Sequence, residues 1–340
     1  MESISRRSFI AGMVGFAAFG VAGCTARGTG TSGGSATMPS EPVSSSSENR
    51  EVETNESQSR GGAVQVPEAA ARTITLNSGY EMPAFGLGTW TLGSDIAESS
   101  TYAALVCGYR LVDTAEYYGN ENGVGRAIAR AAADGVVARE DVFVTSKIAP
   151  SGERDYDAAV DARLDRLGLD YLDLLLVHQQ GAGDEALYQA LERAVDAGKV
   201  RSIGISNFYT TADFDRIADS ARVKPAVVQN ENHIRCQGAE LRAHAAGIGA
   251  FVESYYPLGG RAHVREHLAD ETIVRIAQEH GATPAQVILG WHLQAGYIAI
   301  PGSSDPVHIQ ENAGALGIEL SDADMQAIAA LDTGRRYENW

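Results

Sequence analysis

The stretch LVDTAEYYGNE, residues 111–121, decides how we interpret the rest of the chain. Its short apolar run ends in an acid, Asp113. Tyr118 follows in the polar loop that precedes a helix predicted to begin near Asn120. The pattern therefore predicts an acid and a phenol together at the carboxyl end of a strand.

Two later apolar runs end in the same way. Residues 141–146, DVFVTS, run into Lys147, and residues 171–177, YLDLLLV, run into His178. If these strands are parallel neighbours, their carboxyl ends share one edge of the sheet. We therefore expect Asp113, Tyr118, Lys147 and His178 to converge there.

Apolar runs of strand length alternate with helical stretches from residue 84 onward. The helix predicted at 157–167 shows the typical spacing, with apolar residues recurring near a helical period. Eight such alternations predict a (β/α)8 TIM barrel, whose active site lies at the carboxyl ends of the strands. A short hairpin over residues 73–83 is expected to close the bottom of the barrel. The predicted strands are 85–87, 110–112, 142–145, 172–177, 203–205, 226–229, 249–253 and 298–300.

A doubly wound dinucleotide-binding sheet is the main alternative fold. It would need Gly-x-Gly-x-x-Gly directly after its first strand. The sequence Gly86-Leu87-Gly88-Thr89-Trp90 lacks the third glycine at that spacing. Any dinucleotide must therefore be held in another way.

The first 72 residues differ in composition from the rest. Paired arginines, Arg6 and Arg7, precede a small-residue apolar run that ends at Cys24, a pattern that resembles a twin-arginine export signal with a lipoprotein processing site. Residues 25–72 are rich in Gly, Ser, Thr, Glu and Pro, and they predict a disordered linker. We expect residues 1–24 to be the signal peptide, Cys24 to carry the lipid, and residues 73–340 to form an extracytoplasmic barrel whose only membrane contact is that anchor.

Charge and cysteine content exclude other classes. The formal net charge of −17 argues against a nucleic-acid partner, because phosphate binding needs a basic surface. Cys107 and Cys236 make no metal-binding spacing, and no metal site is predicted. Cys107 is expected in an apolar helix as a small core residue. A disulfide between the two cysteines stays open at this level.

The four converging residues suit the reduction of a carbonyl. When the carbonyl carbon accepts hydride, negative charge develops on the carbonyl oxygen, so a positioned proton donor is needed. Tyr118 can be that acid, and a neighbouring ammonium at Lys147 would lower its pKa. Asp113 would hold Lys147 and offset its buried charge, while His178 would orient the carbonyl.

With these residues in view, the sequence resembles the aldo-keto reductases over residues 73–336, and most closely the 2,5-diketo-D-gluconate reductase branch. Asp113-Thr114-Ala115 with Tyr118, Asn120 and Glu121 matches the first signature, Thr145-Ser146-Lys147 the second and Leu176-Val177-His178 the third. The resemblance implies NADPH-dependent reduction of a small aldehyde or ketone, with a keto-sugar as one candidate. A monomer is expected, although the sequence leaves the oligomeric state open.

The resemblance also implies cofactor contacts at named positions. Trp90 would form a wall of the substrate pocket together with His178. Tyr255 would stack on the nicotinamide, although a tyrosine at a strand end can also be a core aromatic. The remaining positions implied to contact the cofactor are Gly88, Thr89, Ser206, Asn207, Gln229, Leu258, Ser303, Glu311 and Asn312.

The sequence departs from the family in two places. Gly302 and His308 stand where the family has the lysine and arginine that clamp the 2′-phosphate, which predicts a relaxed or reversed preference between NADPH and NADH. Gln179 and Gln180 follow His178, where tryptophan is usual. Together with Val228, Asn230 and Asn232, they predict a wider and more polar substrate pocket.

Two further questions stay open at the level of sequence. A dinucleotide-binding or sensor module with little turnover is the alternative function, because a scaffold does not fix an activity. The tail, residues 335–340, is expected either to fold over the pocket or to fray.

Overall fold

The computed structural model describes residues 72–152 and 154–338. The predicted signal peptide with Cys24, and the predicted linker up to residue 71, lie outside the described residues. Within the described part, no helix is long and apolar enough to cross a membrane.

A sheet of eight parallel strands forms the centre of the domain, in the order β10-β9-β8-β7-β6-β5-β4-β3. Backbone hydrogen bonds join its two ends, because the N–H of Gly86 donates to the carbonyl of Ala299 and that of Ala299 to Ala84. The predicted TIM barrel is thus confirmed. The strands are β3 (Leu87–Gly88), β4 (Leu111–Asp113), β5 (Phe143–Ile148), β6 (Leu172–Val177), β7 (Val200–Ser206), β8 (Val227–Glu231), β9 (Phe251–Tyr255) and β10 (Ile298–Ala299).

The predicted hairpin pairs β1 (Thr73–Thr75) with antiparallel β2 (Glu81–Pro83). Its turn contacts residues that precede or begin barrel strands: Asn77 Nδ2 donates to the carbonyls of Pro225 and Ile248, and Ser78 Oγ lies 2.8 Å from Ser202 Oγ. These contacts place the hairpin across the amino ends of the strands, which is the bottom of the barrel.

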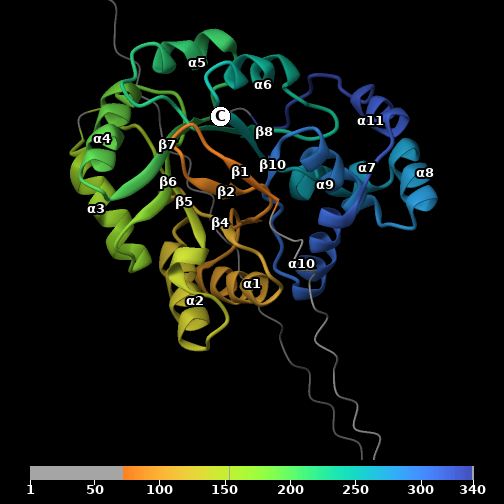
Figure 1. Ribbon diagram of the computed structural model, residues 1–340, viewed down its shortest axis with the longest axis horizontal. Coiled ribbons are helices and arrows are strands. Elements are labelled where there is room, and N and C mark those ends of the chain that lie inside the picture. Colours follow the sequence, from red (N-terminus) through yellow and green to blue (C-terminus); the bar gives the residue numbers. More distant parts are fainter. Residues whose placement is uncertain (1–71, 153, 339–340) are drawn as a thin grey trace, which may run out of the picture. The chain divides into compact units, whose positions relative to one another are not determined.

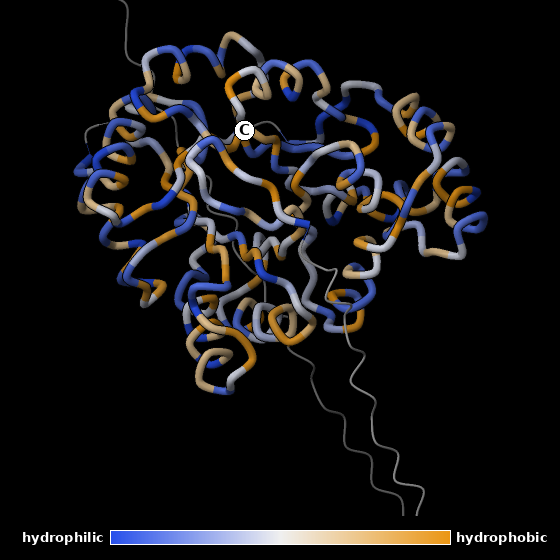
Figure 2. Tube along the Cα trace, viewed as in Figure 1, coloured by the Kyte–Doolittle hydropathy of each residue, from blue (hydrophilic) through white to orange (hydrophobic). Residues whose placement is uncertain are grey.

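Helices surround the strands, as Figure 1 shows. In Figure 2 many of them alternate between hydrophilic and hydrophobic colour, as amphipathic helices do. The α-helices are α1 (Ser94–Val106), α2 (Glu121–Ala133), α3 (Tyr156–Leu167), α4 (Asp184–Asp196), α5 (Thr211–Ala218), α6 (Ala239–Ala246), α7 (Gly260–Leu268), α8 (Glu271–His280), α9 (Pro284–Gln294), α10 (Pro306–Ala313) and α11 (Asp322–Ala329). The 3-10 helices within residues 72–152 and 154–338 are η2 (Glu116–Tyr118), η3 (Arg139–Asp141) and η4 (Gly314–Gly317).

Local sequence explains where helices begin and end. In α3 the Asp155 side chain accepts a hydrogen bond from the Ala158 N–H, and Gly168 ends the helix in the left-handed conformation. Thr283 and Gln286 form a capping box at the start of α9. These signals are strong, and the helix predicted at 157–167 is confirmed as α3.

The core lies between the strands and the inner faces of the helices. Every residue of β5 and β6 is buried, which explains the near-continuous apolar run of β6. One cysteine prediction is wrong: α1 ends at Val106, so Cys107 follows the helix and is only partly buried. Both Cys107 and Cys236 are free thiols, so the disulfide that the sequence left open is absent.

Candidate active site

The structure brings Asp113, Tyr118, Lys147 and His178 together at the carboxyl ends of the strands. Asp113 ends β4, Lys147 lies in β5, His178 directly follows β6, and Tyr118 lies in η2. Lys147 Nζ lies 2.6 Å from Asp113 Oδ1 and 3.0 Å from Tyr118 Oη. The rings of Tyr118 and His178 contact edge to face, with centroids 5.7 Å apart.

The loop that carries Tyr118 is fixed by buried hydrogen bonds. Asn120 donates from its amide to the carbonyls of Thr89 and Leu92, and it accepts from the Thr114 hydroxyl. Behind the loop, the Glu121 carboxylate accepts a hydrogen bond from the Ser146 hydroxyl. Because Asn120 is fully buried, these contacts hold the phenol without depending on solvent.

Burial controls the charges in this cluster. Burial raises the pKa of Tyr118 to about 12, although the Lys147 ammonium opposes that shift, as the sequence suggested. Burial lowers the pKa of Lys147, but its carboxylate and phenol neighbours outweigh burial and raise it. Burial also raises the pKa of Asp113, against the pull of Lys147. Lys147 and Asp113 form an ion pair, because they are in contact and the raised pKa of Lys147 keeps its ammonium protonated.

His178 is neutral at physiological pH. Burial and the nearby Lys147 charge lower its pKa to about 3. Its Nδ1 is buried and has no hydrogen-bond partner among the described residues. A neutral imidazole carries one N–H, which suits donation to a carbonyl oxygen.

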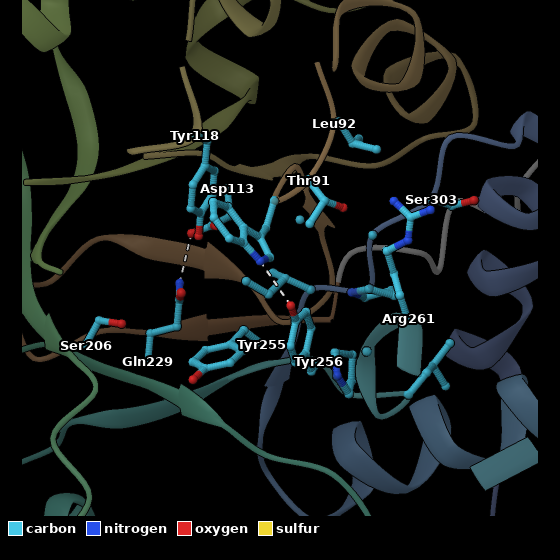
Figure 3. Close-up of a pocket in the computed structure, with 18 of the residues that line it drawn as sticks. Thr91, Leu92, Asp113, Tyr118, Ser206, Gln229, Tyr255, Tyr256, Arg261 and Ser303 are labelled. Carbon is cyan, nitrogen blue, oxygen red and sulfur yellow. Dashed lines mark hydrogen bonds between the residues drawn. The ribbon is translucent and has the colours of Figure 1, made fainter. Parts of the chain in front are cut away.

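A cavity of about 350 Å³ opens above this cluster. Figure 3 shows its lining, with Tyr118 and Asp113 on one side and Tyr255 and Tyr256 on another. The volume lies in the range of small-molecule sites. Its polar and aromatic lining includes Trp90, Asp113, Tyr117, Tyr118, His178, Gln179, Ser206, Asn207, Gln229, Tyr255, Tyr256, Arg261 and Ser303.

One end of the cavity fits a carboxamide and a flat ring. Gln229 uses both protons of its amide nitrogen on Asp113 and Glu253, at 2.8 Å each, so its carbonyl oxygen is left as an acceptor. Ser206 accepts weakly from Asn207 at 3.4 Å, and its own hydroxyl proton can donate. The Tyr255 ring lines the same region, where burial holds its pKa far above the usual range. These groups match the acceptor, donor and π face that a nicotinamide requires.

A family model described as "Aldo/keto reductase family" matches residues 84–333. The chain belongs to the aldo/keto reductase family. It is therefore an oxidoreductase, and the family resemblance seen in the sequence is confirmed.

Relatives and solved structures agree with that assignment. An "Aldo-keto reductase" of Mycolicibacterium smegmatis is 41% identical over 269 residues, which are 77% of this chain and 94% of the relative. The "NAD(P)H-dependent D-xylose reductase I,II" of Candida tropicalis is 36% identical over 309 residues, with 78% and 94% covered. The crystal structure of an aldo/keto reductase from Brucella melitensis is 37% identical with a TM-score of 0.71, covering 77% of this chain and 100% of that one.

The other positions implied by the family resemblance divide into two groups. Gly88, Leu258 and Ser303 line the cavity. Thr89, Glu311 and Asn312 are not in its lining: Thr89 is buried with its hydroxyl on the Asp113 carbonyl, and the other two lie on α10. A Cβ on Gly88 would lie 2.7 Å from the Ile300 carbonyl oxygen, and one on Gly302 would lie 2.9 Å from that of Gly88. Glycine at both positions therefore lets two backbones approach closely here.

The predicted polar substrate pocket is only partly observed. Gln179 lines the cavity, whereas Gln180 turns away to donate to the Asn207 carbonyl. Val228, Asn230 and Asn232 do not line it, because Val228 packs in the core and both asparagines bond buried backbone groups. The prediction was wrong for these three positions, since alternate residues along and after β8 face away from the site.

The carboxyl-terminal tail folds onto the barrel as far as Glu338. The backbone N–H groups of Tyr337 and Glu338 donate to the Glu231 carboxylate at 2.6 and 2.9 Å. The Tyr337 ring stacks on His263 with centroids 3.7 Å apart. Residues 335–338 therefore do not fray, but none of them is in the cavity lining, so the predicted fold over the pocket is not observed for them.

Several residues of the site were missed by sequence reasoning. Tyr256 accepts a hydrogen bond from Trp90 Nε1 at 3.0 Å, and Arg261 lines the cavity from α7 with its side chain directed toward Ser303 (Figure 3). Glu253 lies buried behind Gln229. A carboxyl in the middle of the apolar run FVESY was the available signal for Glu253, because buried strands rarely carry charge.

Proposed function

We propose that the protein reduces an aldehyde or ketone to the alcohol with NAD(P)H, and that Tyr118 is the general acid. The observation that carries this proposal is the Tyr118 hydroxyl, which lies 3.0 Å from the Lys147 ammonium and lines the cavity. An acid beside a fixed positive charge can give up its proton as negative charge develops on the carbonyl oxygen.

The chain supplies every group except the hydride. When bound, the reduced nicotinamide supplies that hydride; Tyr255, Gln229 and Ser206 would hold its ring and carboxamide. The neutral His178 would donate its N–H to the carbonyl oxygen and orient it. Asp113 keeps Lys147 charged and in place, so the Tyr118 proton is delivered at a fixed point.

We infer a polyhydroxylated carbonyl, such as a keto-sugar, as the substrate class. Gln179 and His178 give the substrate side polar groups, and Trp90 and Tyr117 give it flat walls suited to the faces of a sugar. Two relatives carry the name D-xylose reductase. Cofactor oxidation with a panel of aldoses, keto-sugars and unsubstituted alkyl ketones tests this inference; faster turnover of the alkyl ketones would overturn it.

The cofactor preference is proposed to be relaxed or reversed toward NADH. Gly302 has no side chain with which to contact a 2′-phosphate, and His308 is 65% exposed beside the Asp305 carboxylate at 3.9 Å. Losing charge-assisted contacts weakens NADPH selectively. Dissociation constants measured by quenching of protein fluorescence check this, and a preference for NADPH above about a hundredfold, about 2.7 kcal/mol, contradicts it.

The Tyr118→Phe variant tests the assigned acid. Turnover should fall by at least a hundredfold, because general acid catalysis contributes about 10²–10⁴. The dissociation constant of the cofactor should stay within about twofold. Tyr80→Phe on the exposed hairpin is the matched control, and it removes a phenol hydroxyl far from the cavity. Unchanged turnover in Tyr118→Phe would refute the role, and cofactor binding without any turnover in the parent protein would favour the sensor alternative.

We also propose that the protein is exported as a monomer and lipid-anchored through Cys24, on the sequence pattern that lies outside the described residues. Changing Arg6 and Arg7 to Lys should retain the protein in the cytoplasm, and Cys24→Ser should release it from the membrane fraction. Cell fractionation with the parent chain as control tests both steps. A parent chain found in the cytoplasm would contradict the proposal.

A further inference from the structure

Glu253 is a buried carboxyl that the proposed chemistry does not use. It lies in β9 directly beside Gln229 of β8 in the parallel register. Its side chain is fully buried, and its Oε2 accepts from Gln229 Nε2 at 2.8 Å. The same nitrogen donates to Asp113 Oδ2, also at 2.8 Å. One amide therefore bridges Glu253 to the carboxylate that holds Lys147.

The cluster holds more acid than base. The charged and titratable groups facing Glu253 are Asp113 from β4, Lys147 from β5 and Tyr118 from η2. Lys147 is the single cation among them, and its closest carboxylate is Asp113, at 2.6 Å. A second ionised carboxylate here would be a buried charge without a counter-ion, which is costly.

The hydrogen bonding of Glu253 supports the same conclusion. Its Oε1 has no hydrogen-bond partner among the described residues. A carboxylate with one oxygen unsolvated is much less stable than the neutral acid in such a place. Burial, with the Asp113 charge acting in the same direction, raises the pKa of Glu253 to about 8.

We propose that Glu253 is a positioning residue that, as a neutral acid, fixes the Gln229 amide and, when ionised, makes the Tyr118 proton harder to remove. The inference rests on the proposed function, because it concerns the acid and the cofactor contact assigned there. Glu253 is then a second proton-binding group, which lies behind Tyr118, the group whose proton reacts.

The fixed amide sets what Gln229 can offer to the cavity. Both protons of Nε2 are used on the two carboxyl groups, so only the carbonyl oxygen remains. That oxygen can accept a hydrogen bond from the NH₂ group of the nicotinamide carboxamide. It cannot pair with the carboxamide carbonyl, because both oxygens are acceptors. Glu253 thereby selects one orientation of the nicotinamide amide.

The charge effect has a definite sign. Ionised Glu253 adds negative charge near Tyr118, which stabilises the phenol over the phenolate and raises the pKa of Tyr118 further. Oxidation of the alcohol, the reverse reaction, needs Tyr118 as a base and speeds up as Tyr118 ionises. Glu253 should therefore push the alkaline rise of that reaction to higher pH.

Infrared spectroscopy of the protein labelled with ¹³C-glutamate tests the neutral acid without requiring turnover. The C=O stretch of a protonated glutamic acid should be present at pH 7, should vanish by about pH 10, and should be absent from Glu253→Gln. A glutamate spectrum without this band at pH 7, or a band that persists in Glu253→Gln, overturns the proposal. If Glu253→Gln does not fold, Glu253→Asp serves instead. Aspartate carries no ¹³C-glutamate label, so loss of the labelled band in that variant still assigns the band to Glu253.

The pH profile of alcohol oxidation tests the coupling to Tyr118. In Glu253→Gln the midpoint of the alkaline rise should move to lower pH by at least half a unit, while Glu279→Gln, an exposed carboxyl on α8, should leave it in place. A lower rate with an unchanged midpoint would mean a merely structural role and overturn the coupling. A parent protein without oxidation activity refutes the proposed function instead, and the infrared band still decides whether Glu253 is neutral.

Discussion

The charge balance of the site depends on the ammonium group of Lys147. It is fully buried and contacts Asp113, Tyr118 and the carbonyl of Thr114. Removing it would leave the Asp113 carboxylate buried without a counter-ion. The cost of such a change exceeds the value of the ion pair itself, because the remaining charge keeps its desolvation penalty.

Lys147→Met is expected to lower the free energy of unfolding by about 3–5 kcal/mol and to abolish reduction. The double variant Lys147→Met with Asp113→Asn should recover much of that stability, since no unpaired charge remains, but it should recover no activity. Urea unfolding and turnover measured on both variants check this. Equal stability of the single and double variants would show that Asp113 is not charged in the folded protein.

His178 makes a prediction about pH. Its pKa is lowered to about 3, so the imidazole is neutral from about pH 4 upward and its charge does not change near pH 6.5. The rate of carbonyl reduction should therefore show no step near pH 6.5 that depends on this residue. His178→Gln, which keeps an N–H donor, should lower the rate by a similar factor at pH 5 and pH 8; a factor that changes tenfold between them would contradict a neutral imidazole.

At the residue scale, the sequence predicted which groups meet but not how their charges balance. Asp113, Lys147 and His178 are close together because parallel strands share one edge, a rule that needs no knowledge of packing, and Tyr118 lies in the loop that follows β4. The net pKa of Tyr118 depends on how deeply the phenol is buried, which the sequence does not state. Arg261 reaches the cavity from the first turn of α7, and no strand end marks its position.

At the scale of elements, the close approach of α2 and α3 makes stability sensitive to the size of the side chain between them. Gly125 lies inside α2, and a Cβ there would fall well inside van der Waals contact with the backbone of Leu167 at the end of α3. Replacing an exposed helical glycine with alanine normally raises the free energy of unfolding by about 1 kcal/mol. Here the contact is with backbone, which cannot rotate away.

Gly125→Ala should therefore lower the free energy of unfolding by about 3 kcal/mol, despite the gain in helix propensity. Gly317→Ala is the control, because a Cβ at that position meets nothing within 4 Å and the backbone there is not left-handed. Chemical denaturation of both variants measures the difference. A stabilised Gly125→Ala would show that α2 and α3 can separate at little cost.

Element positions were predicted better than element ends. The run 172–177 matches β6 at both ends, because the strand is buried throughout and bounded by polar residues. The predicted strand at 85–87 is observed as β3 at Leu87–Gly88, and residues 84–86 instead bond residue 299 to close the barrel. That closure joins segments far apart in the chain, so local patterning carries no signal for it.

At the scale of the whole molecule, buried neutral histidines couple stability to acid. The pKa of His178 is lowered to about 3 and that of His267 to about 4, both chiefly by burial. His267 is fully buried, with its Nε2 2.8 Å from the Tyr337 hydroxyl of the docked tail. The unfolded chain takes up protons at such residues near pH 6.5, whereas the folded chain does not.

Because the unfolded state binds more protons below pH 6.5, the free energy of unfolding should fall as pH decreases from 7 to 5, by about 2 kcal/mol for each such histidine at pH 5. His267→Gln should reduce the slope of stability against pH by about one proton relative to the parent chain. Urea unfolding at pH 5, 6 and 7 measures the slope for each form. A slope unchanged in His267→Gln would mean that His267 is already protonated in the folded protein, and the tail contact through Tyr337 would then have to be that of an imidazolium donor.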